Sequence, residues 1–194
     1  MDEQIITYLE NRRTVPSAQL GEPGPDATTL ARLLKIAARV PDHGKLAPWR
    51  FIVYDQSSRR AAVTWLQRRA ALGDDPSEAG KRANKAQIFA NAPLVVGVVS
   101  VPASHQNVPL WEQQLSSAAA CLNLVHAAHA FGFSAQWLTG WYAYDADARV
   151  YLGLDAGERI AGFIHIGTPQ MPPAERDRPD VEALTTFWNP HEDA

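Results

Sequence analysis

The chain has 194 residues, of which 46% are hydrophobic, and this length and composition suit one domain with a well-buried core. Its formal net charge is −3 and its isoelectric point is about 6.0, which disfavours a protein drawn electrostatically to nucleic acid. The single cysteine, Cys121, excludes a disulfide framework or a cysteine-rich zinc site within one chain.

The sequence shows no sign of a targeting or membrane-spanning segment. The first residues, Met1 to Gln4, are acidic and polar, whereas a secretory signal starts with basic residues followed by an apolar run. The longest unbroken apolar run, 93–99, is far too short to cross a bilayer as a helix. We therefore expect a cytoplasmic protein that contacts neither membrane nor nucleic acid.

The first half of the chain predicts three or four helices and one strand. Apolar residues recur at helical spacing from Ile5 until the segment ends near Arg12. A second helix, capped by Asp26 or Thr28, is stopped by Pro41. After these come a strand over 50–54 and two helices over about 59–71 and 77–90, separated by the turn 73–76.

The second half predicts a buried sheet and the longest helix. Residues 93–99 are apolar on both faces, as in a central strand that is covered on both sides. An alanine-rich helix covers 112–131 and ends at Gly132. The remaining elements are strands over 133–138 and 160–167 and a short helix over 146–152. This order of elements predicts an α+β class with three α/β/α layers, in a single domain covering 1–194.

The C-terminal segment has a different character. After Thr168 the sequence becomes rich in proline and charge, and it then carries the aromatic pair Phe187 and Trp188. A polar tail with an aromatic pair has little to bury against within its own domain. We expect residues 171–194 to form an arm that packs on a partner subunit.

Two segments are candidates for binding an anion. Arg12, Arg13 and Thr14 follow the first helix, and guanidinium forks with a hydroxyl match phosphate oxygens. Arg39 and His43, around the loop that begins at Pro41, would reach the same anion from another side. The alternatives are arginines that complement a helix C-terminus and ordinary surface side chains.

A third segment could receive a flat ligand. Residues 137–141 combine tryptophans with small and hydroxyl residues at a strand end, where a planar molecule can approach the backbone, although ordinary core aromatics would look similar. The sequence has no G-x-G-x-x-G, Walker A or G-x-S-x-G motif. Side chains would therefore have to hold any phosphate, and a hydrolase is disfavoured.

The histidines are weaker candidates for a functional site. His126 and His129 share a helix face, but no carboxylate accompanies them at matching spacing, so we expect packing and no metal site. His165 lies within an apolar strand and is expected to be a core histidine with satisfied hydrogen bonds.

Ordered motifs over about residues 5–170 resemble the nitroreductase family of FMN-dependent oxidoreductases. Each motif alone is weak, but their order and spacing together are specific. The matching pieces are Arg12-Arg13-Thr14, Pro41-Asp42-His43, Pro48-Trp49-Arg50-Phe51, Ala92-Pro93, Trp111-Glu112-Gln113, Gly132-Phe133, Trp137-Leu138-Thr139-Gly140, Gly162-Phe163 and Gly167-Thr168-Pro169-Gln170.

The resemblance implies an intertwined homodimer, with a mixed central sheet flanked by helices and FMN at each subunit interface. NADH or NADPH would reduce the FMN, and a nitroaromatic, a quinone or a similar acceptor would then be reduced in the same cleft. It further implies that Arg12 and Thr14 grip the FMN phosphate with help from Arg13. The other subunit would supply Arg39 and His43, and the flavin would be lined by Trp137, Leu138 and Thr139. No catalytic residue is assigned.

Two departures from the family leave alternatives open. Many relatives carry a lysine where this chain has Pro16, and Lys45 is a candidate substitute. The basic residue that binds phosphate near the C-terminus in the family has no counterpart at 167–170. The alternatives are a flavin enzyme of the same fold acting on oxygen, a carbon–halogen bond or an enoyl group, and a non-catalytic FMN-binding dimer.

Overall fold

The computed structural model describes residues 1–72 and 75–189, and it is built around a five-stranded sheet. The strands are β1 (Leu20–Gly21), β2 (Trp49–Tyr54), β3 (Leu94–Ser100), β4 (Ser134–Leu138) and β5 (Arg159–Pro169). Their order is β1-β5-β3-β2, and β4 also pairs with β5. The predicted strands are confirmed, whereas β1 is too short to show any sequence periodicity.

The prediction of a mixed sheet is wrong, because every pairing within the described residues is antiparallel. Between β2 and β3 the chain passes through two helices, α3 (Gln56–Ala70) and α4 (Pro76–Gln87), and then returns to the same end of the sheet. A two-helix excursion of this kind gives antiparallel neighbours, whereas a single crossover helix would give parallel ones.

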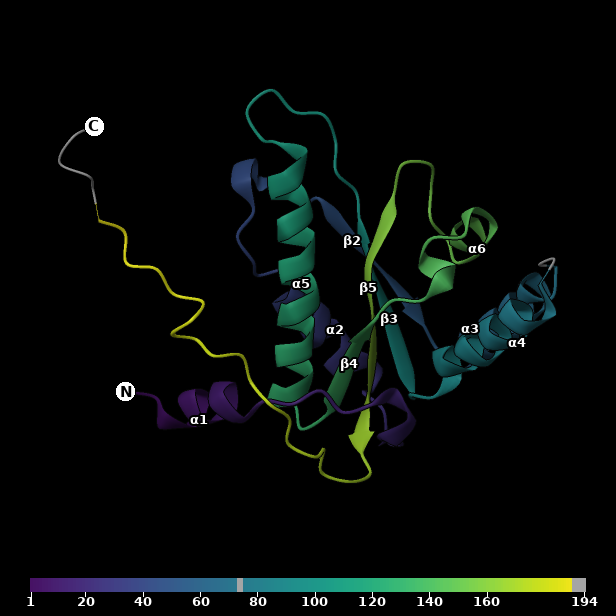
Figure 1. The fold of residues 1–194 in the computed structure, drawn as a ribbon, viewed down its shortest axis with the longest axis horizontal. Coiled ribbons are helices and arrows are strands. Elements are labelled where there is room, and N and C mark those ends of the chain that lie inside the picture. The colour runs from purple at the N-terminus through teal and green to yellow at the C-terminus, as the bar shows by residue number, and fades with distance from the viewer. Residues whose placement is uncertain (73–74, 190–194) are drawn as a thin grey trace.

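Helices cover both faces of the sheet, so the three-layer α/β/α architecture is confirmed (Figure 1). On one face lie α2 (Ala27–Ala37) and the long helix α5 (Leu110–Ala130). The opposite face is covered by α3, α4, α6 (Ala146–Tyr151) and the 3-10 turn Trp141–Ala143. All seven residues of β3 are buried, as the apolar run predicted, and they alternate between the two cores.

Local signals account for most helix ends. Asp26, and not Thr28, caps α2, because its Oδ1 accepts a hydrogen bond of 2.7 Å from the backbone N–H of Thr29. Asp55 caps α3 in the same way, which starts that helix three residues earlier than predicted. Gly132 ends α5 with a φ of +82°, a conformation that favours glycine. The predicted turn 73–76 falls partly outside the described residues.

His165 departs from expectation. It is fully buried on β5, as predicted, but neither ring nitrogen has a protein hydrogen-bond partner. Its face of the sheet carries aromatic neighbours such as Phe89, whose ring centroid lies 6.2 Å away, and these offer no acceptor in the ring plane. The predicted satisfied hydrogen bonds are therefore wrong.

Two segments project from the layers on the side of α5 (Figure 1). Helix α1 (Glu3–Asn11) contains no buried residue, although it carries Ile5 and Leu9. The chain after β5 is mostly extended and exposed through residue 189. Within 1–72 and 75–189, no helix is both long enough and apolar enough to cross a bilayer.

Candidate functional site

Two of the predicted site residues, Arg12 and Arg13, line a cavity at the end of α1. The cavity has a volume of about 470 Å³, and the side chains around it come from α1, α5, the start of β4 and the tail. Arg12 and Arg13 reach it because α1 ends at Asn11. Its lining is Thr7, Tyr8, Asn11, Arg12, Arg13, Val15, His129, Ser134, Pro173 and Glu175.

The two arginines differ in their partners. Arg13 Nη1 lies 2.6 Å from Glu175 Oε1, and the same carboxylate oxygen lies 3.3 Å from Arg178 Nη2. Arg12 has no carboxylate within 4.0 Å among the described residues, so its charge is open to an anion. A backbone N–H and then the Arg13 guanidinium lower the pKa of Glu175, which keeps this exposed carboxyl ionised.

The tail also brings a cation that the sequence did not identify. Arg178 donates a hydrogen bond to the carbonyl oxygen of Arg12 at 3.5 Å, although 166 positions separate the two residues. Residues 167–170, at the end of β5, contain no basic side chain. Only the path of the folded tail shows that a residue further along returns to Arg12.

Helix α1 contacts α5 through three ring side chains, which are Tyr8, His126 and His129. The Tyr8 hydroxyl lies 2.8 Å from His126 Nδ1, and the Tyr8 ring centroid lies 5.6 Å from each histidine ring. Burial, followed by the charge of Arg12, lowers the pKa of both histidines, so both favour the neutral form. The Nε2 atom of His129 is buried and has no protein partner. The sequence analysis assigns His129 to packing, and only the folded chain shows that it lines this cavity.

No metal-binding constellation accompanies these histidines. Across the part of the chain that the structure describes, no group of three or more histidine, cysteine or acidic side chains is close enough to hold an ion. The hydrogen bond between His126 and Tyr8 joins α1 to the end of α5.

The segment after Arg13 runs along β4. The backbone N–H of Ser17 donates to Gln136 Oε1 at 2.5 Å, and this contact holds the two segments together. Thr14 is exposed and does not line the cavity. Because a strand rises about 3.3 Å per residue, Trp137 lies roughly 10 Å along β4 from the cavity residue Ser134.

Trp137 lies flat along the sheet. Its Nε1 donates to the carbonyl oxygen of Ala161 at 3.1 Å, and 38% of the residue remains exposed. Gly162 makes this possible, because a Cβ atom there would stand 2.0 Å from Trp137 Nε1. Leu138 is partly buried and Thr139 is exposed at the strand end. The three residues thus form an accessible edge next to the arginine cavity.

His43 lies far from Arg12 within one chain, whereas the Arg39 carbonyl accepts a hydrogen bond from Asn123 Nδ2 at 3.2 Å, three positions before His126 on α5. His43 Nδ1 is 2.7 Å from Oε2 of Glu112, in the first turn of α5, whereas Arg12 lies near His126 and His129 in its last turns. Fourteen residues of helix between Glu112 and His126 span about 21 Å. Lys45, the candidate substitute for the cation missing at Pro16, shares a single 3-10 turn with His43.

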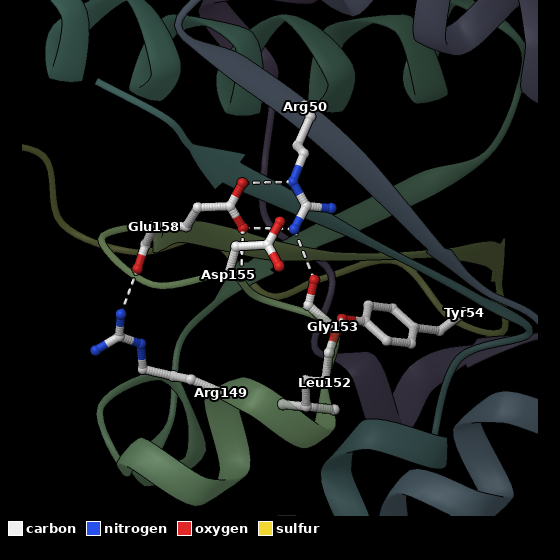
Figure 2. Close-up of polar contacts among 7 residues, drawn as sticks. All are labelled: Arg50, Tyr54, Arg149, Leu152, Gly153, Asp155 and Glu158. Carbon is white, nitrogen blue, oxygen red and sulfur yellow. Dashed lines mark hydrogen bonds and ion pairs between the residues drawn. The ribbon is translucent and has the colours of Figure 1, made fainter. Parts of the chain in front are cut away.

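Arg50, in the motif Pro48-Trp49-Arg50-Phe51, belongs to a separate polar network that joins β2 to the loop before β5 (Figure 2). Its Nε lies 2.7 Å from Glu158 Oε1, and its Nη2 contacts Glu158 Oε2 and the Gly153 carbonyl. Glu158 is buried, and hydrogen bonds from Arg50 lower its pKa. The network fastens the loop between α6 and β5 onto β2, so Arg50 is structural.

Comparison with known proteins agrees with this architecture. Residues 9–168 match the model of the nitroreductase family. The chain is 30% identical over 184 residues to "Putative NAD(P)H nitroreductase YdjA" of Escherichia coli K12, covering 94% of this chain and 98% of that protein. A Haemophilus influenzae protein of the same general name is 36% identical over 174 residues, which are 89% of this chain and 91% of that one.

Solved structures show the same fold. A nitroreductase-like family protein from Bacillus cereus superposes with a TM-score of 0.81 and 22% identity, covering 95% of each chain. A nitroreductase with bound FMN from Bacteroides fragilis gives 0.76 and 18%, covering 95% of this chain and 99% of that one. With a family model that spans most of the sequence and relatives at 30–36% identity, the chain belongs to the nitroreductase family.

Proposed function

We propose that this protein is an FMN-dependent oxidoreductase that transfers electrons from NADH or NADPH to nitroaromatics, quinones or similar electron-poor molecules. The observation that carries the proposal is the cavity lined by Arg12 and Arg13, which adjoins the exposed edge of β4 in a chain of this family. The relatives named above are called NAD(P)H nitroreductases, and the Bacteroides fragilis structure holds FMN.

The residues around the cavity fit a flavin phosphate. Arg12 offers a guanidinium fork without a carboxylate partner among the described residues, and His129 Nε2 borders the same space without a protein partner. Arg13 and Arg178 add positive charge, part of which Glu175 balances. Charge-assisted hydrogen bonds from such groups are the usual means of holding a phosphate when no glycine-rich loop is present.

When bound, FMN supplies the redox chemistry: it accepts a hydride from NADH or NADPH and passes the electrons on to the acceptor. Arg12 and Arg13 would hold its phosphate, with Thr14 in the adjoining exposed segment, and Trp137, Leu138 and Thr139 would line the flavin ring. Trp137 is fixed by its bond to Ala161 and excludes water from that edge.

No side chain in this site is required as a nucleophile. The only cysteine, Cys121, is buried in the core beneath α5, and burial raises the pKa of its thiol to about 12. A protonated, buried thiol is inert. A free thiol is the state that the reducing cytoplasm favours, and we propose a cytoplasmic location for the protein.

The proposed active form is a homodimer in which each flavin site uses both chains. About 21 Å along α5 separate His43 from Arg12, so the partner must supply His43 if both residues serve one flavin, and we propose that it also supplies Arg39. Helix α5 exposes apolar side chains along one stripe, and α1 buries none of its own within the chain. The exposed residues of the α5 stripe are Trp111, Leu115 and Leu122.

The C-terminal arm, residues 171–194, is the last part of the proposed dimer interface. Residues after 170 leave the body beside α1 and expose Val181, Leu184, Phe187 and Trp188. Exposed apolar groups on this scale favour an interface, and we propose that residues 171–194 pack on the partner subunit.

An absorption spectrum of the purified protein, taken before and after anaerobic NADPH or NADH, tests the function directly. We expect a yellow protein that releases FMN on denaturation and is bleached by the reduced nicotinamide. A colourless protein that also fails to take up added FMN would refute the proposal. Flavin that neither nucleotide reduces would favour the non-catalytic FMN-binding dimer.

A further inference from the structure

A second cavity lies between the start of α3 and the turn before β3, and it shares no residue with the Arg12 cavity. Its volume is about 220 Å³. It is lined by Leu20, Gly21, Glu22, Gln56, Arg59, Arg60, Ala90, Asn91, Ala92 and Pro93. None of these residues is assigned to the flavin, so this cavity has no role in the proposed function.

Arg59 is the unusual residue of this cavity. Only 5% of it is exposed, its Nη1 donates to the Ala90 carbonyl at 2.9 Å, and its Nε has no protein acceptor. Among the described residues no carboxylate oxygen lies within 4.0 Å of it. Arginine is almost never buried without a partner, because removing its charge from water is costly. Burial accordingly lowers the pKa of Arg59.

The surrounding groups do not balance this charge by contact. Asp55 is the cap of α3, where it accepts hydrogen bonds from Ser57 and Ser58. Glu22 borders the cavity, but its Oε2 accepts from the Gly24 backbone N–H at 2.9 Å. His165 is buried with both ring nitrogens unpaired, and the charge of Arg59 helps to keep it neutral.

Two further donors face the same space. Arg60 adds a second guanidinium from the next position of α3, and Asn91 adds an amide with two N–H donors. One of these amide donors makes only a 3.4 Å contact with Ser17 Oγ. With Gln56, the cavity therefore gathers four nitrogen-bearing side chains, one of them a buried cation without an ion-pair partner among the described residues.

We propose that this cavity binds a phosphate group, either free or carried by a small phosphorylated metabolite. Arg59 and Arg60 would bind its oxygens and Asn91 would donate to a third position. Guanidinium forks match phosphate oxygens, and two cations balance a dianion. Glu22, on the rim, opposes an anion and sets the affinity.

Calorimetric titration of the full-length chain with inorganic phosphate tests the site. The Arg12→Gln protein serves as the reference, so that the flavin cavity contributes little. We expect saturable binding, which Arg60→Gln weakens about tenfold, the loss of roughly one charge-assisted contact. Arg68→Gln changes the same charge on an exposed part of α3 outside the cavity, and it should leave binding within about twofold.

The variant Glu22→Gln should change the phosphate affinity in the opposite direction. Its amide oxygen can still accept the hydrogen bond from the Gly24 backbone N–H. Removing this rim carboxylate should tighten phosphate binding several-fold, a result that a purely structural role for Arg59 does not produce.

A comparison of O-phosphoserine with inorganic phosphate distinguishes the two sources of the phosphate group. Tighter binding of the ester indicates a carried phosphate, and weaker binding indicates the free ion. Absence of saturable binding, an Arg60→Gln protein that binds like the reference, or acetate binding as tightly as phosphate overturns the proposal.

Discussion

Arg12 is the residue on which the proposed flavin site depends most, because, of the two arginines that line this cavity, it is the one without an ion-pair partner among the described residues. Replacing Arg12 by alanine should weaken FMN binding about 10- to 100-fold, the loss of one or two charge-assisted hydrogen bonds. Quenching of FMN fluorescence measures the affinity, and Arg68→Ala on α3 is the charge-matched control. Equal affinity in the Arg12 variant would remove the phosphate assignment.

His165 makes a prediction about stability at acidic pH. Burial, followed by the charge of Arg59, lowers its pKa to about 4 in the folded protein, against about 6.5 in an unfolded chain. The unfolded state therefore binds more protons between these values, and stability falls as the pH drops from 6.5 to 4. The shift corresponds to about 3 kcal/mol across that range.

The variant His165→Leu should lose this part of the pH dependence. It removes two buried ring nitrogens that have no protein partner, so little stability should be lost near neutral pH. Urea unfolding at pH 4.5 and 7 gives the two free energies for each protein. His105→Leu, on an exposed loop, should keep the wild-type difference. A His165→Leu protein as acid-sensitive as wild type would contradict the neutral, buried histidine.

At the scale of elements, the Arg50–Glu158 network joins the loop before β5 to β2 (Figure 2). Glu158 is buried, whereas a third of the Arg50 side chain is exposed, so solvent screens part of their attraction. Glu158→Gln should destabilise the protein by about 2 kcal/mol, which is below the usual cost of breaking a fully buried pair.

Thermal and urea unfolding measure this loss. Glu78→Gln is the control, because its 2.7 Å ion pair with Lys81 is exposed and should contribute less than about 0.5 kcal/mol. If both variants lose the same small amount of stability, the network does not fasten the loop.

Element prediction succeeded where the cause is local. The seven apolar residues of β3, the cap Asp26 and the terminator Gly132 each act within a few positions of the chain. It failed for β1, whose two residues pair with β5 across the chain, and for the direction of strand pairing. Both depend on where distant segments meet, which periodicity cannot report.

At the scale of the whole molecule, the exposed stripe on α5 predicts a dimer interface. Leu115→Lys should shift the protein to monomer and lower FMN occupancy with it, because a charge would be buried where apolar side chains meet. Sedimentation velocity and the flavin absorbance per chain measure the two effects. Val150→Lys, an exposed valine on α6 across the sheet, should change neither. A dimeric Leu115→Lys protein would place the interface elsewhere.

Mixed dimers test whether each flavin site is shared. Chains carrying His43→Ala and chains carrying Arg12→Ala should form a hybrid in which one site has both defects and the other has none. We expect half of the wild-type flavin in the hybrid, and much less in either parent dimer. Separately tagged chains isolate the hybrid, and its absorbance gives the occupancy. Flavin absent from the hybrid would show that one chain supplies both residues.

The sequence by itself determined the helices, the buried strands and the three-layer class, because capping, periodicity and apolar runs act over a few residues. It also placed the arginines of Arg12-Arg13-Thr14 correctly at the end of the first helix. The tertiary structure alone decided that His129, Glu175 and Arg178 join these arginines, and that His43 lies about 21 Å away along α5. The burial of Arg59 without a contacting counter-charge was also decided by the tertiary structure, because it arises only when distant segments pack around this side chain.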